Sequence, residues 1–315
     1  MRLGFLYAGQ GSQHPGMGAD LYEAYPAFRA VIDSAEVDFG LKEVCFTDSQ
    51  NLLNQTRYTQ PCMVAFAAGL TAVLREQNIV PSAAAGLSLG EYSALHAAGV
   101  FDAQTAIRVV AFRGQAMERA AHGIESAMIA VLGLERTSLE TACAEASGLG
   151  TVVIANYNCP GQLVIGGEKA AVERAAVLAK GKGAKRCLPL KVSGPFHTPL
   201  MAPAGKELEE YFRKISFNDS AVPVVFNCLG GLNTEETPIP ELLVRQVQSS
   251  VYMEDSIRKM AGLGIDAVIE IGPGKALSGF VRKTVPELPV CAVETTADVE
   301  RLTEWLAALE KEKNV

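Results

Sequence analysis

Short apolar runs alternate with segments of helical periodicity along the first third of the chain. Leu3–Tyr7 is an apolar run that ends in the glycine-rich segment 9–13, which predicts a buried strand followed by a tight loop. A second apolar run, Ala83–Leu87, leads directly into Ser88. Residues at helical spacing predict helices over 19–30, over 60–75 and from Ser88 through Ala97. This alternation is typical of an α/β fold.

The rhythm changes between residues 124 and 192. The pattern predicts strands over 126–134, 152–155, 162–165 and 186–190, and helices over 137–145 and 168–180. Thr137-x-x-Glu140 is a capping box that predicts the start of the first of these helices. The order strand, helix, strand, strand, helix, strand predicts a small ferredoxin-like α+β subdomain.

The first rhythm resumes after residue 192. The pattern predicts helices over 199–212, 239–248, 253–263 and 275–282, with strands over 222–226 and 267–271. With 315 residues the chain is longer than one average domain. We therefore predict a large α/β subdomain of residues 1–123 and 193–315, interrupted by a small subdomain of residues 124–192.

Charge and composition narrow the class of protein. The net charge of −7 argues against general nucleic-acid binding, where a basic balance is expected. No apolar run approaches the roughly 18 to 20 residues of a membrane span, so we expect a cytoplasmic protein without a membrane segment. The seven scattered cysteines contain no C-x-x-C pair, which predicts neither a disulfide framework nor a metal site.

Gly86-Leu87-Ser88-Leu89-Gly90 is a G-x-S-x-G sequence between a predicted strand and a predicted helix. This is the context of a nucleophile elbow, in which the glycines permit a strained turn and the serine lies at a helix N-terminus. The backbone N–H of Leu89 is then a natural donor to an oxyanion. Five residues with three fixed positions also recur by chance, which is the alternative interpretation.

A nucleophilic serine needs a base, and the chain has four histidines. His96 lies about 12 Å along the same helix and is out of reach, and His14 and His122 lie in predicted polar loops. We favour His197, which lies between two prolines, over the alternative that it faces solvent.

The acid of a hydrolase triad is missing. Asp102 is the only aspartate between Ser88 and His197, and it is predicted to cap a helix. An esterase or lipase is therefore disfavoured.

Arg113 lies on an apolar helix stripe with Met117, where an arginine either extends to water or binds an anion. Two glycine-rich segments fail as nucleotide sites. The segment 9–14 has His14 where G-x-G-x-x-G needs glycine, and the segment 272–275 lacks the remaining phosphate-loop residues.

Taken together, these residues resemble the malonyl-CoA:acyl carrier protein transacylases of fatty-acid synthesis and the related acyltransferase domains of polyketide synthases. The resemblance covers nearly the whole chain and rests on segments 9–13, 59–61, 86–91, 113–114, 156–158, 194–197 and 272–274. It implies a hydrolase-like core with a parallel sheet, carrying a ferredoxin-like insert. It also implies malonyl-CoA and acyl carrier protein as partners, with no metal and no cofactor, since the CoA thioester is a substrate.

The resemblance also implies roles for individual residues. Ser88 would be the acylated nucleophile and His197 its base, oriented by the backbone carbonyl of Gln246. Gln10 and Leu89 would supply the oxyanion-hole N–H groups, and Arg113 would hold the malonyl carboxylate. The predicted lining of the substrate pocket is Gln60, Met117, Phe196 and Asn158.

Two residues differ from the family's pattern, and two alternative functions remain open. Leu87 stands where the family commonly has histidine, and Met253 lies near a position where relatives often have tryptophan; we expect local packing changes at both. A serine thioesterase and a non-catalytic carrier-protein-binding scaffold are the alternatives.

Two basic clusters are candidates for carrier-protein contact: Lys180, Lys182, Lys185 and Arg186, and Arg282 with Lys283.

Overall fold

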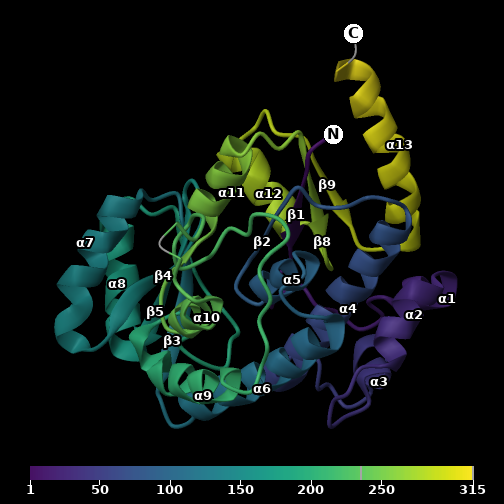
Figure 1. The fold of residues 1–315 in the computed structure, drawn as a ribbon. Coiled ribbons are helices and arrows are strands. Elements are labelled where there is room, and N and C mark those ends of the chain that lie inside the picture. The colour runs from purple at the N-terminus through teal and green to yellow at the C-terminus, as the bar shows by residue number, and fades with distance from the viewer. Residues whose placement is uncertain (235, 314–315) are drawn as a thin grey trace. The chain divides into compact units, whose positions relative to one another are not determined.

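A computed structural model of the protein describes residues 1–234 and 236–313 (Figure 1). The chain divides into two compact units. The first unit contains Met1–Ala111, Asn218–Val225 and the chain from Met260 onward, and the second contains Phe112–Phe217 and Phe226–Lys259.

A four-stranded parallel sheet lies at the centre of the first unit. The strand order is β2-β1-β8-β9, with β1 at Leu3–Tyr7, β2 at Ala83–Gly86, β8 at Ala267–Ile271 and β9 at Val290–Val293 (Figure 1). Every residue of β1, β2 and β8 is buried, as expected for parallel strands that are covered on both faces. The predicted α/β class with a parallel sheet is confirmed.

Helices accompany this sheet in chain order. They are α1 (Ala19–Ala24), α2 (Pro26–Asp33), α3 (Leu41–Phe46), α4 (Thr56–Glu76), α5 (Gly90–Ala97), α12 (Ala276–Thr284) and α13 (Thr296–Lys313). Helix α6 (Ala103–Ala121) begins in the first unit and continues into the second. Asp102 caps α6 as predicted, because its Oδ1 accepts from the Thr105 N–H at 2.7 Å.

Proline accounts for two differences between prediction and structure in the first unit. Pro26 divides the helix predicted over 19–30, because a proline inside a helix clashes with the preceding turn but fits at the first position of a new helix. The strand predicted over 222–226 is reduced to two isolated bridges, of Val224 with Ala84 and of Phe226 with Gly231, in a segment where Pro223 has no N–H to donate.

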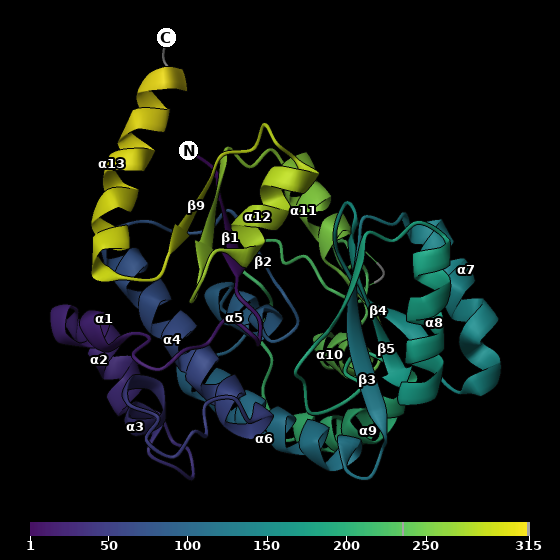
Figure 2. The same cartoon turned by 180° about the vertical axis from the view of Figure 1, so that it is seen from behind.

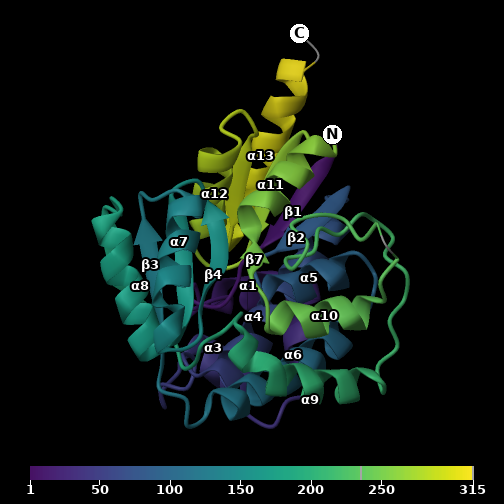
Figure 3. The same cartoon turned by 90° about the vertical axis from the view of Figure 1, so that its left-hand side faces the viewer.

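The second unit contains a five-stranded sheet of order β6-β3-β5-β4-β7. Its strands are β3 (Ser126–Leu132), β4 (Val152–Cys159), β5 (Gln162–Glu168), β6 (Arg186–Pro189) and β7 (Val251–Tyr252). The β6-β3, β3-β5 and β5-β4 pairs are antiparallel, and β4-β7 is parallel. Helices α7 (Arg136–Ala146) and α8 (Lys169–Gly181) lie side by side next to this sheet (Figures 2 and 3). Val131, Leu139 and Ile165 belong to the core between them.

The remaining elements of the second unit are short helices. They are the 3-10 turns at Ser147–Leu149 and Pro199–Met201, α9 (Ala202–Phe212), α10 (Ile239–Val247) and the first part of α11 (Met253–Gly262). The capping box predicted for α7 is wrong. Glu135, not Thr137, precedes the helix, and Arg136 in the first turn pairs with Glu254 and Asp255 at 3.0 and 2.9 Å.

The second unit is larger than the subdomain expected at 124–192. Residues that follow that range attach to the same sheet: β7 pairs with Asn156 and Tyr157 of β4. The ring of Tyr252 stacks on that of Tyr157, with centroids 4.9 Å apart. Contacts between residues about a hundred positions apart therefore extend the unit beyond the predicted limits.

Candidate functional site

The segment between β2 and α5 forms a tight elbow around Ser88. Ser88 has φ 51°, a left-handed conformation that costs free energy for any residue with a Cβ atom. Gly86 and Gly90 are required by close packing. A Cβ atom on Gly86 would overlap the Gly90 backbone, and one on Gly90 would overlap the Tyr7 carbonyl. These contacts present a half-buried serine at the start of a helix.

The loop after β1 lies against this elbow. A Cβ atom on Gly9 would lie 2.5 Å from the Leu87 carbonyl oxygen and 3.2 Å from the Leu87 Cγ, so Leu87 packs on the loop that contains Gln10. Gln10 is fixed by its side chain, whose Nε2 donates to Thr56 Oγ1 at 3.0 Å. Leu89 has helical φ and ψ at the N-cap of α5, so its N–H is among the first amides of the helix. Gln60, on α4, is fully buried in the same unit.

His197 lies in the second unit, in the loop before α9, with only 4% of its surface exposed. Its φ of 61° is also left-handed. Nδ1 lies 2.9 Å from the backbone oxygen of Gln246. Because a carbonyl can only accept, Nδ1 carries the proton and donates, and in the neutral ring Nε2 carries the lone pair of a base.

The end of α10 explains why a carbonyl is available at this position. The last four carbonyls of a helix have no amide partner within it, and here side chains cap three in succession. Gln248 Nε2 donates to Val244 O at 3.1 Å, Ser249 Oγ to Arg245 O at 2.7 Å, and His197 Nδ1 to Gln246 O at 2.9 Å.

Burial controls the protonation of His197. Loss of solvent and then the positive charge of Arg113 lower the pKa of His197 from 6.5 to about 4, while the carbonyls of Gln246 and Ser249 act in the opposite direction. The imidazole is therefore neutral at physiological pH, the form that a general base requires.

Arg113 does not extend to solvent, so that interpretation of the sequence is wrong. The side chain is among the largest fully buried ones of the described chain, with 1% of its surface exposed. Its Nη2 donates to Gln246 Oε1 at 3.1 Å. The neighbouring Phe112 ring stacks on Tyr211 of α9 with centroids 4.1 Å apart, which helps to fix this part of α6. The structure thus joins Arg113, Gln246 and His197 by hydrogen bonds.

The other residues predicted to line the pocket are buried. Met117 lies one turn after Arg113 on α6 with 2% of its surface exposed, Phe196 directly precedes His197, and Asn158 lies on β4. These three belong to the second unit, whereas Ser88 and Gln60 belong to the first.

The remaining histidines have other local partners. His96 Nδ1 lies 3.1 Å from the Phe101 carbonyl, and burial lowers the pKa of His96. His14 is exposed, and its Nε2 pairs with Glu294, which raises the pKa of His14. His122 is exposed at the end of α6. His96 therefore resembles His197 in its carbonyl contact and in the direction of its pKa shift. Of these histidines, His197 is the one on which the charge of Arg113 acts.

Glu270 is a buried carboxylate that the sequence analysis missed. Its two oxygens accept from the Leu277 and Ser278 N–H groups at 2.9 and 2.7 Å. These are the first amides of α12, which a phosphate bound after the Gly272-Pro273-Gly274 segment would need. This geometry agrees with the rejection of a phosphate loop there.

The two basic clusters lie on different units. Lys180, Lys182, Lys185 and Arg186 are exposed from the end of α8 to the start of β6, and Lys182 pairs with Glu145 at 2.8 Å. Leu188, Leu190 and Val192 are exposed just beyond them. Arg282 and Lys283 lie in the last turn of α12, where Arg282 lines a cavity of about 350 Å³.

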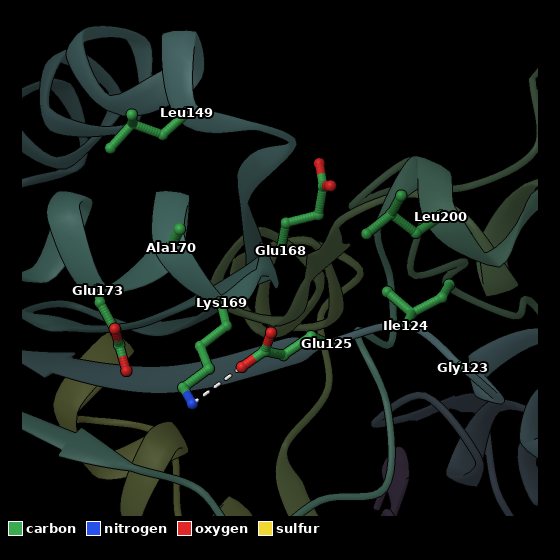
Figure 4. A pocket seen from close by; sticks show the side chains of 9 residues that line it. All are labelled: Gly123, Ile124, Glu125, Leu149, Glu168, Lys169, Ala170, Glu173 and Leu200. Atoms are coloured by element: carbon green, nitrogen blue, oxygen red, sulfur yellow. Dashed lines mark hydrogen bonds and ion pairs between the residues drawn. The ribbon is translucent and has the colours of Figure 1, made fainter.

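A cavity of about 580 Å³ lies in the second unit around the start of α8 (Figure 4). Three of its lining side chains are glutamates, and Lys169 Nζ contacts Glu125 Oε1 at 3.1 Å (Figure 4). None of the described residues that line it is a predicted site residue. We therefore do not assign the chemistry to this cavity.

A metal cluster and a membrane-spanning helix are both absent from the part of the chain that the structure describes. Residues 1–234 and 236–313 contain no group of three or more His, Cys, Asp or Glu side chains arranged to hold a metal ion. Within the same residues, no helix combines the length and apolar character needed to span a membrane.

The chain matches known proteins over almost its whole length. Residues 4–307 match the acyl transferase domain family. The malonyl CoA-acyl carrier protein transacylase of Bacillus subtilis (strain 168) is 40% identical over 316 residues, covering 99% of this chain and 98% of that protein.

Solved structures give the same result. The crystal structure of malonyl CoA-acyl carrier protein transacylase from Clostridium perfringens has a TM-score of 0.96 at 37% identity and covers 100% of both chains. A malonyl-transacylase in complex with a type II PKS acyl-carrier protein has a TM-score of 0.92 at 37% identity, covering 99% of this chain and 100% of that one. With matches of this length and identity, the chain belongs to the acyl transferase family, together with the malonyl CoA-acyl carrier protein transacylases.

Proposed function

We propose that this protein transfers the malonyl group of malonyl-CoA to the phosphopantetheine thiol of acyl carrier protein, through a malonyl-serine ester, and so supplies extender units for fatty-acid biosynthesis. The observation that carries the proposal is the buried Arg113, joined through Gln246 to a histidine whose Nδ1 donates to a carbonyl. A buried guanidinium is suited to a carboxylate, which distinguishes a malonyl substrate from a simple acyl group.

The proposed reaction has two half-reactions at one serine. The Ser88 Oγ attacks the thioester carbonyl while His197 Nε2 takes the hydroxyl proton. The carbon–sulfur bond breaks, and His197 returns the proton to the departing CoA thiolate. In the second half the carrier thiol gives its proton to His197 and attacks the ester, and Ser88 leaves with that proton.

The oxyanion formed in each half needs N–H donors that are already in position. We assign this role to the backbone N–H groups of Leu89 and Gln10. The assignment is supported by the helical geometry of Leu89 at the N-cap of α5 and by the packing of the Gln10 loop on the elbow.

Selectivity in this proposal comes from charge and shape. Arg113 holds the free carboxylate of the malonyl group, and lysine would be a poor replacement because it lacks the planar fork. Phe196 crowds the position of an α-methyl branch, which favours malonyl over methylmalonyl. Gln60, Met117 and Asn158 line the rest of the acyl pocket.

The proposal extends to the fold and the setting of the reaction. We assign the first unit to a hydrolase-like core, supported by its parallel sheet and by the elbow between β2 and α5. We assign β3 to β6 with α7 and α8 to a ferredoxin-like subdomain, supported by the antiparallel order β6-β3-β5-β4. The reaction needs no metal or cofactor, and its proposed location is the cytoplasm.

The test is intact-mass spectrometry in two steps. Malonyl-CoA alone should add one malonyl group to the protein, and holo-acyl carrier protein should then remove it and carry the same mass. Ser88→Ala should form no adduct. An adduct that disappears in buffer without a thiol acceptor would indicate a thioesterase, and a persistent lack of adduct in the unaltered protein would refute acyl transfer.

A further inference from the structure

Gln246 contacts both the arginine and the histidine of the proposed site. We propose that Gln246 couples recognition of the substrate carboxylate to proton transfer: it holds Arg113 with its side chain and His197 with its backbone, so that a carboxylate bound at Arg113 makes His197 a stronger base. This inference rests on the proposed function. It makes Gln246 a positioning residue and makes the malonyl group an activator of its own transfer.

The geometry allows little independent movement of the three side chains. Gln246 Oε1 accepts from Arg113 Nη2 at 3.1 Å, and the backbone oxygen of the same residue accepts from His197 Nδ1 at 2.9 Å. The exposed fractions of Arg113, Gln246 and His197 are 1%, 0% and 4%. Both hydrogen bonds are therefore shielded from water. In the protein interior hydrogen bonds are stronger and charges act over a longer range than in water.

Arg113 is the charged group that acts on the His197 imidazole. Its positive charge opposes protonation of the ring, in the same direction as burial, whereas the carbonyls of Gln246 and Ser249 favour the imidazolium. A general base must become imidazolium as the nucleophile loses its proton. The free protein therefore penalises the charged state through which the reaction passes.

A carboxylate on Arg113 removes much of that penalty. The ion pair has little net charge, so the imidazolium is formed beside an almost neutral pair instead of beside the positive charge that lowers the pKa of His197. A nearby charge changes a pKa by about 1 to 3, so we expect the bound carboxylate to raise the proton affinity of His197 at least about tenfold. An acetyl group has no carboxylate and leaves His197 a weaker base. Discrimination then appears in kcat as well as in KM.

The first experiment measures the His197 pKa with and without the carboxylate. Ser88→Ala protein, which lacks the proposed nucleophile, is saturated with malonyl-CoA or acetyl-CoA, and the imidazole signals are titrated by nuclear magnetic resonance. His197→Asn identifies the His197 signal among the four histidines. We expect the malonyl complex to titrate at least one pH unit above the acetyl complex, a tenfold change in acid dissociation constant.

The possible failures are distinguishable. Binding of malonyl-CoA is followed in parallel by calorimetry. If malonyl-CoA does not bind, the proposed function is overturned and the coupling with it. If malonyl-CoA binds and His197 titrates as in the acetyl complex, the coupling alone is overturned.

The second experiment places the negative charge in the protein itself. Gln246→Glu keeps the backbone carbonyl on His197 and puts a carboxylate beside Arg113. The proton affinity of His197 should therefore rise about tenfold without ligand, which is an increase of about one in its pKa. The same variant should lose preference for malonyl-CoA over acetyl-CoA, because Arg113 is already paired. Gln248→Glu is the matched control: the native Gln248 side chain donates to Val244 O and not to Arg113, so its replacement should shift the titration of His197 less than Gln246→Glu does.

An unchanged His197 titration in folded Gln246→Glu protein would overturn the coupling. If circular dichroism shows that this variant does not fold, the comparison of malonyl-CoA with acetyl-CoA in Ser88→Ala protein decides alone. A merely structural role for Gln246 would alter stability without moving the His197 titration, so the two explanations have different outcomes.

Discussion

Acidification should weaken the folded protein through His197. Burial and the charge of Arg113 lower the pKa of His197 from 6.5 to about 4 in the folded state. In the unfolded chain the imidazole titrates near the ordinary value of about 6.5. Between these values the unfolded state binds a proton that the folded state does not. Stability therefore rises with pH across this window and is lost as the pH falls.

The size of the effect follows from the two pKa values. Each unit of difference corresponds to about 1.4 kcal/mol, so the fall from 6.5 to about 4 gives a total of about 3 kcal/mol. About 2 kcal/mol of this should be lost between about pH 7 and about pH 5. Below about pH 4 both states are protonated at this residue, and no further loss comes from it.

Urea unfolding at a series of pH values, followed by circular dichroism, measures this loss. The comparison variant is His197→Asn, because an asparagine amide can donate to the Gln246 carbonyl but does not titrate. The unaltered protein should lose about 2 kcal/mol more than His197→Asn between about pH 7 and about pH 5. Other groups, including the half-buried His96, titrate in both proteins and cancel in the difference.

His122→Asn provides the control for the loss of a histidine at an exposed position, and the difference between the unaltered protein and His197→Asn should persist when both carry this change. Parallel stability curves for the unaltered protein and His197→Asn would refute the reasoning. They would mean that His197 is protonated with similar ease in the folded and unfolded states, and that it does not have the buried environment described above.

Three further changes test other parts of the site. Arg113→Ala should reduce kcat/KM for malonyl-CoA at least about thirtyfold more than for acetyl-CoA, since losing one partner of a buried charge pair costs about 2 kcal/mol or more. Equal losses for the two substrates in steady-state assays would contradict the role of Arg113 with the carboxylate. Gly86→Ala should lower the unfolding free energy by about 1–3 kcal/mol, because the new methyl group overlaps the Gly90 backbone. Gly148 has open space around it, so Gly148→Ala should not lower the unfolding free energy measured by the same urea titration. Arg186→Glu should raise KM for acyl carrier protein several-fold more than Arg282→Glu, because exposed apolar side chains follow Arg186 along the chain. A larger increase in KM for Arg282→Glu would favour the basic cluster on α12 as the site of carrier-protein contact.

Local patterns predicted the parts of the fold that depend on local residues. The apolar runs at Leu3–Tyr7 and Ala267–Ile271 have the bounds of β1 and β8, because buried parallel strands are continuous apolar runs between turn residues. The edge strand β9 was missed, since it is four residues long and three of them are only half-buried. A short and partly exposed strand has little periodicity to detect.

The features of the candidate site also differ in how far the local sequence predicts them. The elbow at Ser88 was predictable because the two glycines that permit it flank the serine in the chain, although the Tyr7 carbonyl that requires Gly90 is distant in sequence. The contact between Arg113 and Gln246 joins residues 133 positions apart, and no local pattern contains it. The resemblance to a family supplied the Gln246 backbone carbonyl but not the role of its side chain. That role depends on where α6 lies next to the end of α10 within one unit, which is a property of packing.

The backbone itself sets Ser88 and His197 apart from most of the chain. Among the described residues, only six that are not glycine have positive φ, and three of these are aspartate or asparagine. Ser88 and His197 are two of the other three. A strained residue persists only where its surroundings hold it: Ser88 is held by packing around Gly86 and Gly90, and His197 by its hydrogen bond to Gln246. The adduct assay therefore tests Ser88, and the titration tests His197, so the two measurements address different residues of the proposed reaction.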